Sequence, residues 1–238
     1  MEKQTNVPQL RFPEFEGEWE KKKLGDIGNI VTGSTPPTAN NSYYNGNFLF
    51  VSPADIQDSR YITNTITTLT QDGFVKGRRI PAGSSMFVCI GSTIGKVAQA
   101  RKECITNQQI NAVLPINNNS DFVFSLLEYH SGNIKLLSAV QAVPIINKTT
   151  LSNYNLNLPT LPEQQKIASF FTALDQKISQ LKLKKTLLEQ YKKGVMQKIF
   201  SQEIRFKDDN GQEFPKWEKR KLKDVAEIKY GKDQKGIA

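Results

Sequence analysis

The segment Leu158-Pro-Thr-Leu-Pro162-Glu163-Gln-Gln-Lys-Ile167 separates two parts of the chain with different patterns, and the fold class follows from this division. Its two prolines restrict the backbone and suit the first turn of a helix that follows. From Ile167 onward, apolar residues fill eight of ten positions spaced alternately by four and three residues, with lysine in the other two. This heptad pattern predicts a coiled-coil helix over residues 161–200. The apolar positions, called the seam below, are Ile167, Phe171, Leu174, Ile178, Leu181, Leu188, Val195 and Ile199.

A helix of this length spans about 55 Å at ~1.5 Å per residue. One small domain cannot cover such a seam, so we expect a partner helix. In isolation, the seam fits a spacer or an oligomerisation device. The basic residues along the helix fit a solvated face; alternatively they face DNA or an acidic protein partner. These residues are Lys182, Lys184, Lys185, Lys192 and Lys193.

Residues 1–160 show short apolar runs that are separated by Gly, Pro and Asn turns, which indicates a domain with many strands. Ser120-Asp121 is the predicted N-cap of a helix, and a second short helix is predicted over 134–142. The fold class is therefore α+β: a mixed α/β domain followed by a long coiled-coil helix. The predicted strands are 27–32, 48–52, 86–90 and 110–114.

A motif near the N-terminus is repeated after the long helix. The segment 19–27, WEKKKLGDI, reappears as 217–225, WEKRKLKDV, at an offset of 198 residues, and Gly33 maps onto Gly231. Residues 201–238 are therefore predicted to be the truncated start of a second domain of the first type. Looser matches upstream are Arg11-Phe12 with Arg205-Phe206 and Phe15 with Phe214.

The charge distribution favours a polyanionic partner. The net charge is +9, and residues 76–102 contain six bases and no acid. Such an excess attracts phosphate backbones through counterion release, although a solvated basic face is an equally good interpretation of charge alone. No apolar run is long enough to cross a membrane, and no secretion signal is present. The two cysteines, Cys89 and Cys104, are predicted to be buried thiols in a protein of the reducing cytoplasm.

Catalysis by this chain is not expected. His130 is the only histidine and lies in a Leu-rich helical run, so we predict a structural role for it. The segment Gly91–Lys96 has three residues between its glycines, whereas a phosphate-binding loop has four, and Val97 follows where Ser or Thr would bind magnesium. No metal-binding or methyl-donor motif is present. We therefore predict no catalytic residue, no metal and no cofactor in this chain.

The order of the motifs resembles the specificity subunits of type I restriction–modification systems, and the resemblance covers nearly the whole chain. Its most specific parts are the proline-rich start of the long helix and the internal repeat. The motifs that carry it are residues 19–27, Thr32–Pro37, Tyr43-Tyr44, Phe50–Ile56, Ile90–Lys96, Thr106–Gln109 and Leu158–Ala168.

The resemblance implies a target-recognition domain at 1–160, a spacer helix at 161–200 and the start of a second recognition domain at 201–238. It implies that two antiparallel spacer helices separate two domains, each of which reads half of an interrupted double-stranded DNA site. Modification subunits, which bind S-adenosylmethionine, would methylate adenine. Motor subunits, which use ATP and magnesium, would add cleavage.

The chain departs from this pattern because the second spacer helix is missing. Two copies paired antiparallel through their seams would rebuild a pseudo-complete subunit, which would read an interrupted palindrome. The competing hypotheses are an inactive truncated remnant and a coiled-coil module that binds protein only.

Candidate DNA contacts follow from residue type. Basic side chains would bind phosphates and thereby position the domain, while an arginine at 78 or 79 would alternatively pair with guanine. Two tyrosines in a polar loop suit base edges, and two glutamines match adenine. The candidates are Tyr43, Tyr44, Lys76, Arg78, Arg79, Ser92, Thr93, Lys96, Arg101, Lys102, Gln108 and Gln109.

Overall fold

A computed structural model describes residues 7–57, 59–138, 144–229 and 231. The chain divides into two compact units, residues 1–178 and 179–238. The first unit contains the mixed domain together with the first turns of the long helix α5 (Leu161–Phe200).

A five-stranded sheet forms the centre of the first unit, in the order β2–β10–β7–β8–β4. Neighbouring strands in this order are antiparallel, except that β4 runs parallel to β8. Alternate residues of each strand point to opposite faces, so both faces are covered by apolar side chains. The strands are β2 (Gly28–Thr32), β10 (Ile110–Pro115), β7 (Ser85–Val88), β8 (Val97–Ala100) and β4 (Tyr61–Ile62).

One face of this sheet packs against helix α3 (Ser120–Leu136), where Phe87 and Val113 join a core cluster with Leu127 and Ile134 of the helix. Helix α3 is capped by Asn119, whose Oδ1 accepts the Phe122 amide at 2.9 Å. The predicted cap at Ser120-Asp121 is therefore wrong by one residue. Asn119 fills the role because its short amide side chain reaches the amide three residues on.

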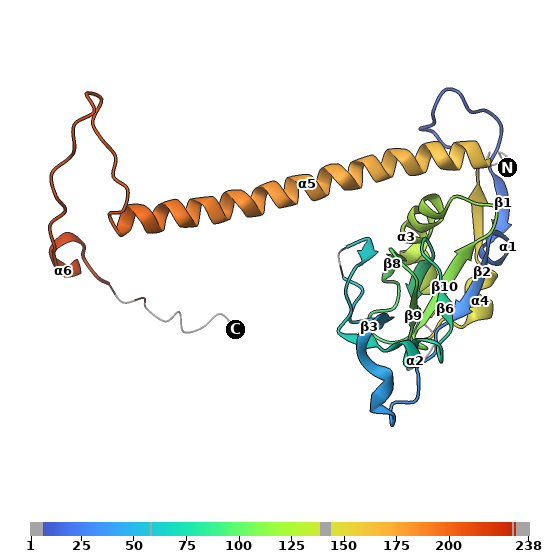
Figure 1. Ribbon diagram of the computed structural model, residues 1–238. Coiled ribbons are helices and arrows are strands. Elements are labelled where there is room, and N and C mark those ends of the chain that lie inside the picture. The colour runs from blue at the N-terminus through green and yellow to red at the C-terminus, as the bar shows by residue number, and fades with distance from the viewer. Residues whose placement is uncertain (1–6, 58, 139–143, 230, 232–238) are drawn as a thin grey trace. The chain divides into compact units, whose positions relative to one another are not determined.

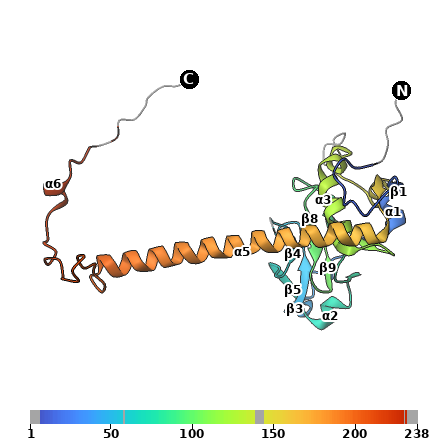
Figure 2. The same cartoon turned by 90° about the horizontal axis from the view of Figure 1, so that it is seen from above.

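The other face of the sheet packs against a second sheet of four strands, in the order β5–β3–β9–β6. Met86 and Val88 of the first sheet share this cluster with Leu49 and Val51 of the second. Figures 1 and 2 both show β3 and α2 (Gln71–Phe74) far from β1 (Glu20–Lys23) and α1 (Leu24–Ile27). The second sheet consists of β5 (Thr67–Leu69), β3 (Tyr44–Val51), β9 (Cys104–Thr106) and β6 (Arg79–Ile80).

The repeated N-terminal motif forms β1 (Glu20–Lys23) and the one-turn helix α1 (Leu24–Ile27). Strand β1 pairs antiparallel with β11 (Asn155–Leu158), which directly precedes the long helix. A short helix, α4 (Lys148–Ser152), was not predicted. The predicted helix over 134–142 is wrong at its start, because Ile134 belongs to α3, and residues 139–142 lie outside the described residues.

The four predicted strands correspond to β2, β3, β7 and β10, and the fold class α+β is confirmed. The predicted long helix is also present, with bounds Leu161–Phe200. At the domain end of the seam, Ile167 packs against the core cluster of α3, whereas Ile178 and Leu188 in the middle of the seam are 49% and 56% exposed. Most of the seam therefore lacks a cover within the part of the chain that the structure describes.

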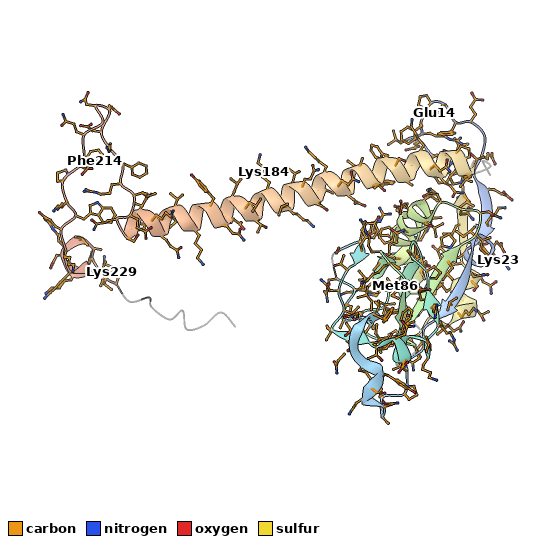
Figure 3. All side chains as sticks on the ribbon, in the orientation of Figure 1. Glu14, Lys23, Met86, Lys184, Phe214 and Lys229 are labelled. Atoms are coloured by element: carbon orange, nitrogen blue, oxygen red, sulfur yellow. The ribbon has the colours of Figure 1, made fainter. Side chains whose placement is uncertain are left out.

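In the second unit, residues 201–229 form a turn closed by the bridge between Lys207 and Glu213, and a one-turn helix, α6 (Leu222–Val225). Figure 3 labels Phe214 in this segment. The apolar residues of α6 are exposed.

Candidate nucleic-acid interface

The start of α5 is fixed to the domain by a buried carboxylate. Glu163 is 1% exposed, and its two oxygens accept hydrogen bonds from Arg11 Nε and Nη2 at 2.8 and 2.7 Å. Trp19 Nε1 donates to the same carboxylate at 3.2 Å. The hydrogen bond with Glu163 raises the pKa of Arg11 above its ordinary value. Glu163 therefore anchors the start of α5 to the N-terminal segment. Its negative charge near the helix N-terminus also suits the helix dipole.

Gln164 provides a second buried anchor at the same turn. Its Nε2 donates to Asn118 Oδ1 at 2.9 Å and to the Pro159 carbonyl at 3.0 Å. Its Oε1 accepts the Asn119 amide at 3.0 Å. Together, Glu163 and Gln164 join the start of α5 to the N-terminal segment and to the start of α3.

Arg60, in the loop before β4, links this loop to α3 and to a point further along α5. Its side chain is 9% exposed and forms ion pairs with Asp121 at 2.6 Å and Asp175 at 2.9 Å. Its Nε donates to Gln99 Oε1 at 2.9 Å, and its guanidinium lies 4.7 Å from the Phe124 ring centroid. Arg60 therefore ties the loop before β4 to α3 and to α5.

Sequence reasoning did not identify this role of Arg60. Arg60 lies outside the basic stretch at 76–102, and its carboxylate partners are 61 and 115 residues away in sequence. Only the three-dimensional fold brings these groups together.

One group of candidate residues meets at the turn after β2. Arg78 Nη1 donates to the Thr32 carbonyl at 2.8 Å, and the Arg78 amide donates to Ser34 Oγ at 2.8 Å. Gln108 Oε1 accepts the Thr35 hydroxyl at 2.5 Å. This turn therefore brings together Arg78 and Gln108, which are 30 residues apart in sequence.

Gly33 makes this junction possible. A Cβ atom at Gly33 would lie 2.0 Å from the Asn107 carbonyl oxygen and 2.3 Å from Thr106 Oγ1. The Gly33 amide donates to the Ile110 carbonyl at 3.0 Å, and the Ser34 amide donates to the Thr106 carbonyl at 2.8 Å. The glycine is thus required by the close approach of two backbones.

The tyrosine loop lies beside the same turn. Tyr44 donates its hydroxyl to the Pro36 carbonyl at 2.8 Å, so its polar group is engaged within the fold. Tyr43 belongs to the short 3-10 helix η1 (Asn41–Tyr43) and is half-buried. Arg79 lies with its guanidinium 5.5 Å from the Phe74 ring centroid, and Lys76 follows α2 with an exposed side chain.

A second group lies in the loop between β7 and β8. Ser92 is exposed and Thr93 is half-buried. Lys96 Nζ donates to the Ile56 carbonyl at 3.0 Å, which makes it a poorer candidate for phosphate than an unbound lysine. Gln109 lies outside this loop, between β9 and β10, and its Oε1 accepts a hydrogen bond from Asn107 Nδ2 at 3.0 Å.

The last two candidates lie in the turn between β8 and β9. Arg101 and Lys102 are exposed, and the Arg101 guanidinium lies 4.9 Å from the Tyr61 ring centroid. Each individual DNA contact stays a prediction from residue type and position.

Other polar groups have structural surroundings. His130 Nδ1 lies 3.1 Å from the Tyr154 hydroxyl, and burial lowers the pKa of His130. Burial also raises the pKa of Cys89 to about 11 and that of Cys104 to about 12. Within the described ranges, no cluster of three or more His, Cys, Asp or Glu side chains is placed to hold a metal ion. None of the helices described there is both long and apolar enough to span a bilayer.

A groove of about 820 Å³ lies between α3 and the first turns of α5. Its wall is mainly apolar and includes Phe122, Leu126 and Tyr129 of α3 and Ile167 and Phe171 of α5. Because Ile167 and Phe171 are the first two seam residues, the groove continues the uncovered seam into the domain.

Comparison with known proteins identifies the family. The chain matches the family model described as "Type I restriction modification DNA specificity domain" over residues 16–190. This match covers more than half of the chain, so the chain belongs to that family. The resemblance inferred from the sequence is thereby confirmed.

Two relatives are specificity subunits of type I restriction enzymes. The chain is 26% identical over 242 residues to the MjaIX subunit of Methanocaldococcus jannaschii, covering 96% of this chain and 56% of that relative. It is 32% identical over 163 residues to the HindI subunit of Haemophilus influenzae, covering 64% of this chain and 35% of that relative. The chain thus spans about half the length of the curated relatives it matches.

The fold is similar to that of the HsdS subunit of Thermoanaerobacter tengcongensis. The TM-score is 0.53 with 23% sequence identity, and the match covers 74% of this chain and 41% of that chain. The likeness extends the family assignment to the architecture.

Proposed function

We propose that this chain reads one half of a two-part DNA site on behalf of a type I restriction–modification complex and catalyses no reaction itself. The observation that carries the proposal is the specificity-domain match over a unit in which candidate residues from distant segments meet at one turn. Lys76, Arg79 and Tyr43 lie near this turn on the second sheet and its flanking segments, so base and phosphate contacts would come from one region.

The proposal assigns the chemistry to partner subunits. Modification subunits would bind S-adenosylmethionine and methylate adenine, and motor subunits would bind ATP with magnesium. The complex would work in the cytoplasm, which suits the two free, buried cysteines. The lysines along α5, such as Lys184 in Figure 3, would face either DNA or acidic surfaces of the modification subunits.

The proposal includes a second copy of the chain as the partner of the seam. In an antiparallel pair with two-fold symmetry, each contact occurs twice with the roles of the copies exchanged. The seam meets this requirement when the two-fold axis passes beside residue 183. Each of its ten heptad positions, including those of Lys185 and Lys192, then lies opposite another of the ten. The opposed pairs are Ile167 with Ile199, Phe171 with Val195, Leu174 with Lys192, Ile178 with Leu188, and Leu181 with Lys185.

This register explains why an isolated chain leaves large side chains uncovered. Leu174, Ile178, Leu181 and Leu188 are 43% to 56% exposed, and such a run on one face marks an interaction surface. The groove between α3 and α5 would receive the C-terminal turns of the partner's helix, since Ile167 and Phe171 lie opposite Ile199 and Val195.

Selection of binding sites from random DNA tests the DNA-reading role. The chain, purified together with its modification subunits, is incubated with a random duplex library, and bound DNA is sequenced after washing at increasing salt. We expect an enriched interrupted motif and an affinity that falls steeply between about 50 and 200 mM salt. No enriched motif together with salt-insensitive binding would instead favour a module that binds protein only.

A further inference from the structure

We propose that residues 201–229 form a second clasp for the start of a helix, and that it binds the Glu163 end of α5 in a second copy of this chain. The inference rests on the proposed two-copy assembly. Below, the N-terminal clasp means Arg11, Phe12 and Trp19, and the C-terminal clasp means Arg205, Phe206 and Trp217.

The N-terminal clasp shows what such a device holds. Arg11 and Trp19 both bind the Glu163 carboxylate, and Phe12 meets Phe170 edge to face with ring centroids 6.1 Å apart. Lys166 lies 5.4 Å above the Phe12 ring and pairs with Glu14 at 3.0 Å. Figure 3 shows Glu14 in this segment. The N-terminal clasp therefore binds a helix start that has a carboxylate in its first turn and an aromatic residue two turns later.

The C-terminal clasp repeats the same internal geometry. Arg11 donates to the carbonyls of Glu16 at 3.0 Å and Gly17 at 2.5 Å, the third and second residues before Trp19. Arg205 donates to the carbonyls of Phe214 at 3.0 Å and Pro215 at 2.5 Å, the third and second residues before Trp217. Arg205 and Trp217 are separated by four more residues than Arg11 and Trp19. The extra residues lie between Arg205 and Phe214, in the turn that Asp208 closes by accepting the Gln212 amide at 2.7 Å.

The structure following each clasp is also repeated. Helix α6 begins and ends 198 residues after α1, so both copies place a one-turn helix at the same distance from the tryptophan. The second repeat of the motif therefore shares the arginine contacts and the one-turn helix of the first, whereas strand β1 has no counterpart in it within the described residues. Its arginine is already oriented by two backbone carbonyls, which lowers the entropic cost of binding a carboxylate.

The two clasps differ in what they contact. Leu24 and Ile27 of α1 are 1% exposed, whereas Leu222 and Val225 of α6 are 64% and 62% exposed. Arg11 holds Glu163, whereas no ion pair joins Arg205 to a carboxylate within the described residues. The C-terminal clasp thus presents a cation and an apolar face that fit a helix start with a buried acid.

The antiparallel register determines which helix start is available. Glu163 is 20 residues before the symmetry point at residue 183, so the position opposite it on the partner is residue 203. Arg205 follows two residues later. The C-terminal clasp of one copy therefore begins beside Glu163 of the other, which makes the second copy its occupant.

The two clasps compete for one carboxylate. In each copy Arg11 already holds Glu163, and removing that arginine would leave a buried charge without compensation, which is strongly destabilising. Arg205 of the partner can supply the missing cation. Replacement of Arg11 at Glu163 by the partner's Arg205 would join the two copies at both ends of the paired helices, in addition to the contact along the seam.

Cross-linking of the full chain tests this arrangement. One chain carries Phe206→Cys and the other Phe170→Cys. These positions are chosen because Phe12, the counterpart of Phe206 in the N-terminal clasp, contacts Phe170 of the same chain. A short bismaleimide joins thiols that come close, and the native Cys89 and Cys104 do not interfere because both are buried. Thr186→Cys, an exposed site in the middle of α5, replaces Phe170→Cys in the control mixture.

We expect a cross-linked heterodimer at several times the level of the Thr186→Cys control. Adding Arg11→Ala to both chains should increase the cross-linked fraction further, and Arg205→Ala should abolish that increase. A level equal to the control, in a sample that sediments as a dimer, would overturn the clasp and leave the two-copy assembly standing. A monomer by sedimentation would overturn both, while DNA selection with modification subunits would still test the DNA-reading role separately.

Discussion

The guanidinium of Arg60 lies 2.9 Å from the carboxylate of Asp175, and this ion pair joins the loop before β4 to the long helix. The same guanidinium holds Asp121 at the start of α3. A rigid link of this kind is needed if a helical spacer is to determine where a recognition domain meets DNA. Arg60 is therefore a positioning residue in the proposed function.

Replacement of Arg60 by alanine should destabilise the first unit. The variant leaves Asp121, Asp175 and Gln99 without their shared donor. We expect a loss of roughly 2 kcal/mol in the free energy of unfolding, less than the ~3–5 kcal/mol for fully buried pairs because both carboxylates are partly exposed. Urea unfolding measures the loss. Arg101→Ala, at an exposed arginine that also lies over Tyr61, is the control and should change stability little.

Replacement of Gly33 by alanine should disrupt the turn that holds Arg78 and Gln108. The new Cβ would lie 2.0 Å from a backbone carbonyl, so the two segments must separate. The expected loss in the free energy of unfolding is roughly 1–3 kcal/mol. DNA binding should also be weaker when equal amounts of folded protein are compared. Gly132→Ala in α3 is the control, because nothing lies within 4 Å of its added Cβ. A Gly33→Ala protein as stable as the natural chain would refute the close approach.

Replacement of Glu128 by glutamine should stabilise the chain at neutral pH. Burial, followed by the nearby Asp175 carboxylate, raises the pKa of Glu128 above its ordinary value. A carboxyl with a raised folded-state pKa favours folding when protonated and loses that contribution as pH rises through the folded-state pKa. The melting temperature of the variant should therefore exceed that of the natural chain at pH 7.5 and converge with it under acidic conditions. Glu18→Gln, at an exposed carboxyl, is the matched control.

Two variants should separate base reading from phosphate binding. Gln108→Ala should relax the sequence preference at one or two base pairs, at a cost of ~1–3 kcal/mol for the preferred site. Lys76→Ala should weaken binding to all sequences equally and reduce the salt slope by about one. Binding titrations on preferred and scrambled duplexes at several salt concentrations measure both effects. Equal losses on both duplexes for Gln108→Ala would remove it from the base-reading set.

A charge in the seam should dissociate the proposed pair of chains. Ile178 lies opposite Leu188 in the antiparallel register, so Ile178→Asp would bury a carboxylate against leucine. Sedimentation should show a monomer at concentrations at which the natural chain is a dimer. Lys177→Asp makes a larger charge change at the neighbouring exposed residue and should leave the dimer intact. Equal behaviour of the two variants would contradict the seam.

The sequence predicted those features that depend on local periodicity. The long helix over 161–200, the four strands and the repeated motif follow from spacing that the backbone imposes on apolar residues. The repeat even extends to the one-turn helices α1 and α6, whose bounds differ by the same offset as the motif.

The candidate site was less predictable, because long-range contacts decide which basic residues are free. Lys96 belongs to the basic stretch, yet its ammonium group is bound to the Ile56 carbonyl. Arg60 lies outside that stretch, yet it joins three elements. Glu163 was noted as part of a motif, but its burial between Arg11 and Trp19 depends on a segment 152 residues away. Composition and spacing do not contain this information.

A map of adenine methylation across the genome, made after co-expression of this chain with its modification subunits, is the sharpest test of the proposed two-copy DNA reader. Two identical recognition domains related by a two-fold axis must read inverted half-sites, so we expect new methylation at an interrupted palindrome. An asymmetric interrupted site would mean that a different domain supplies the second half. No new methylation, although the subunits purify together, would contradict the account and leave a subunit that docks without directing the enzyme.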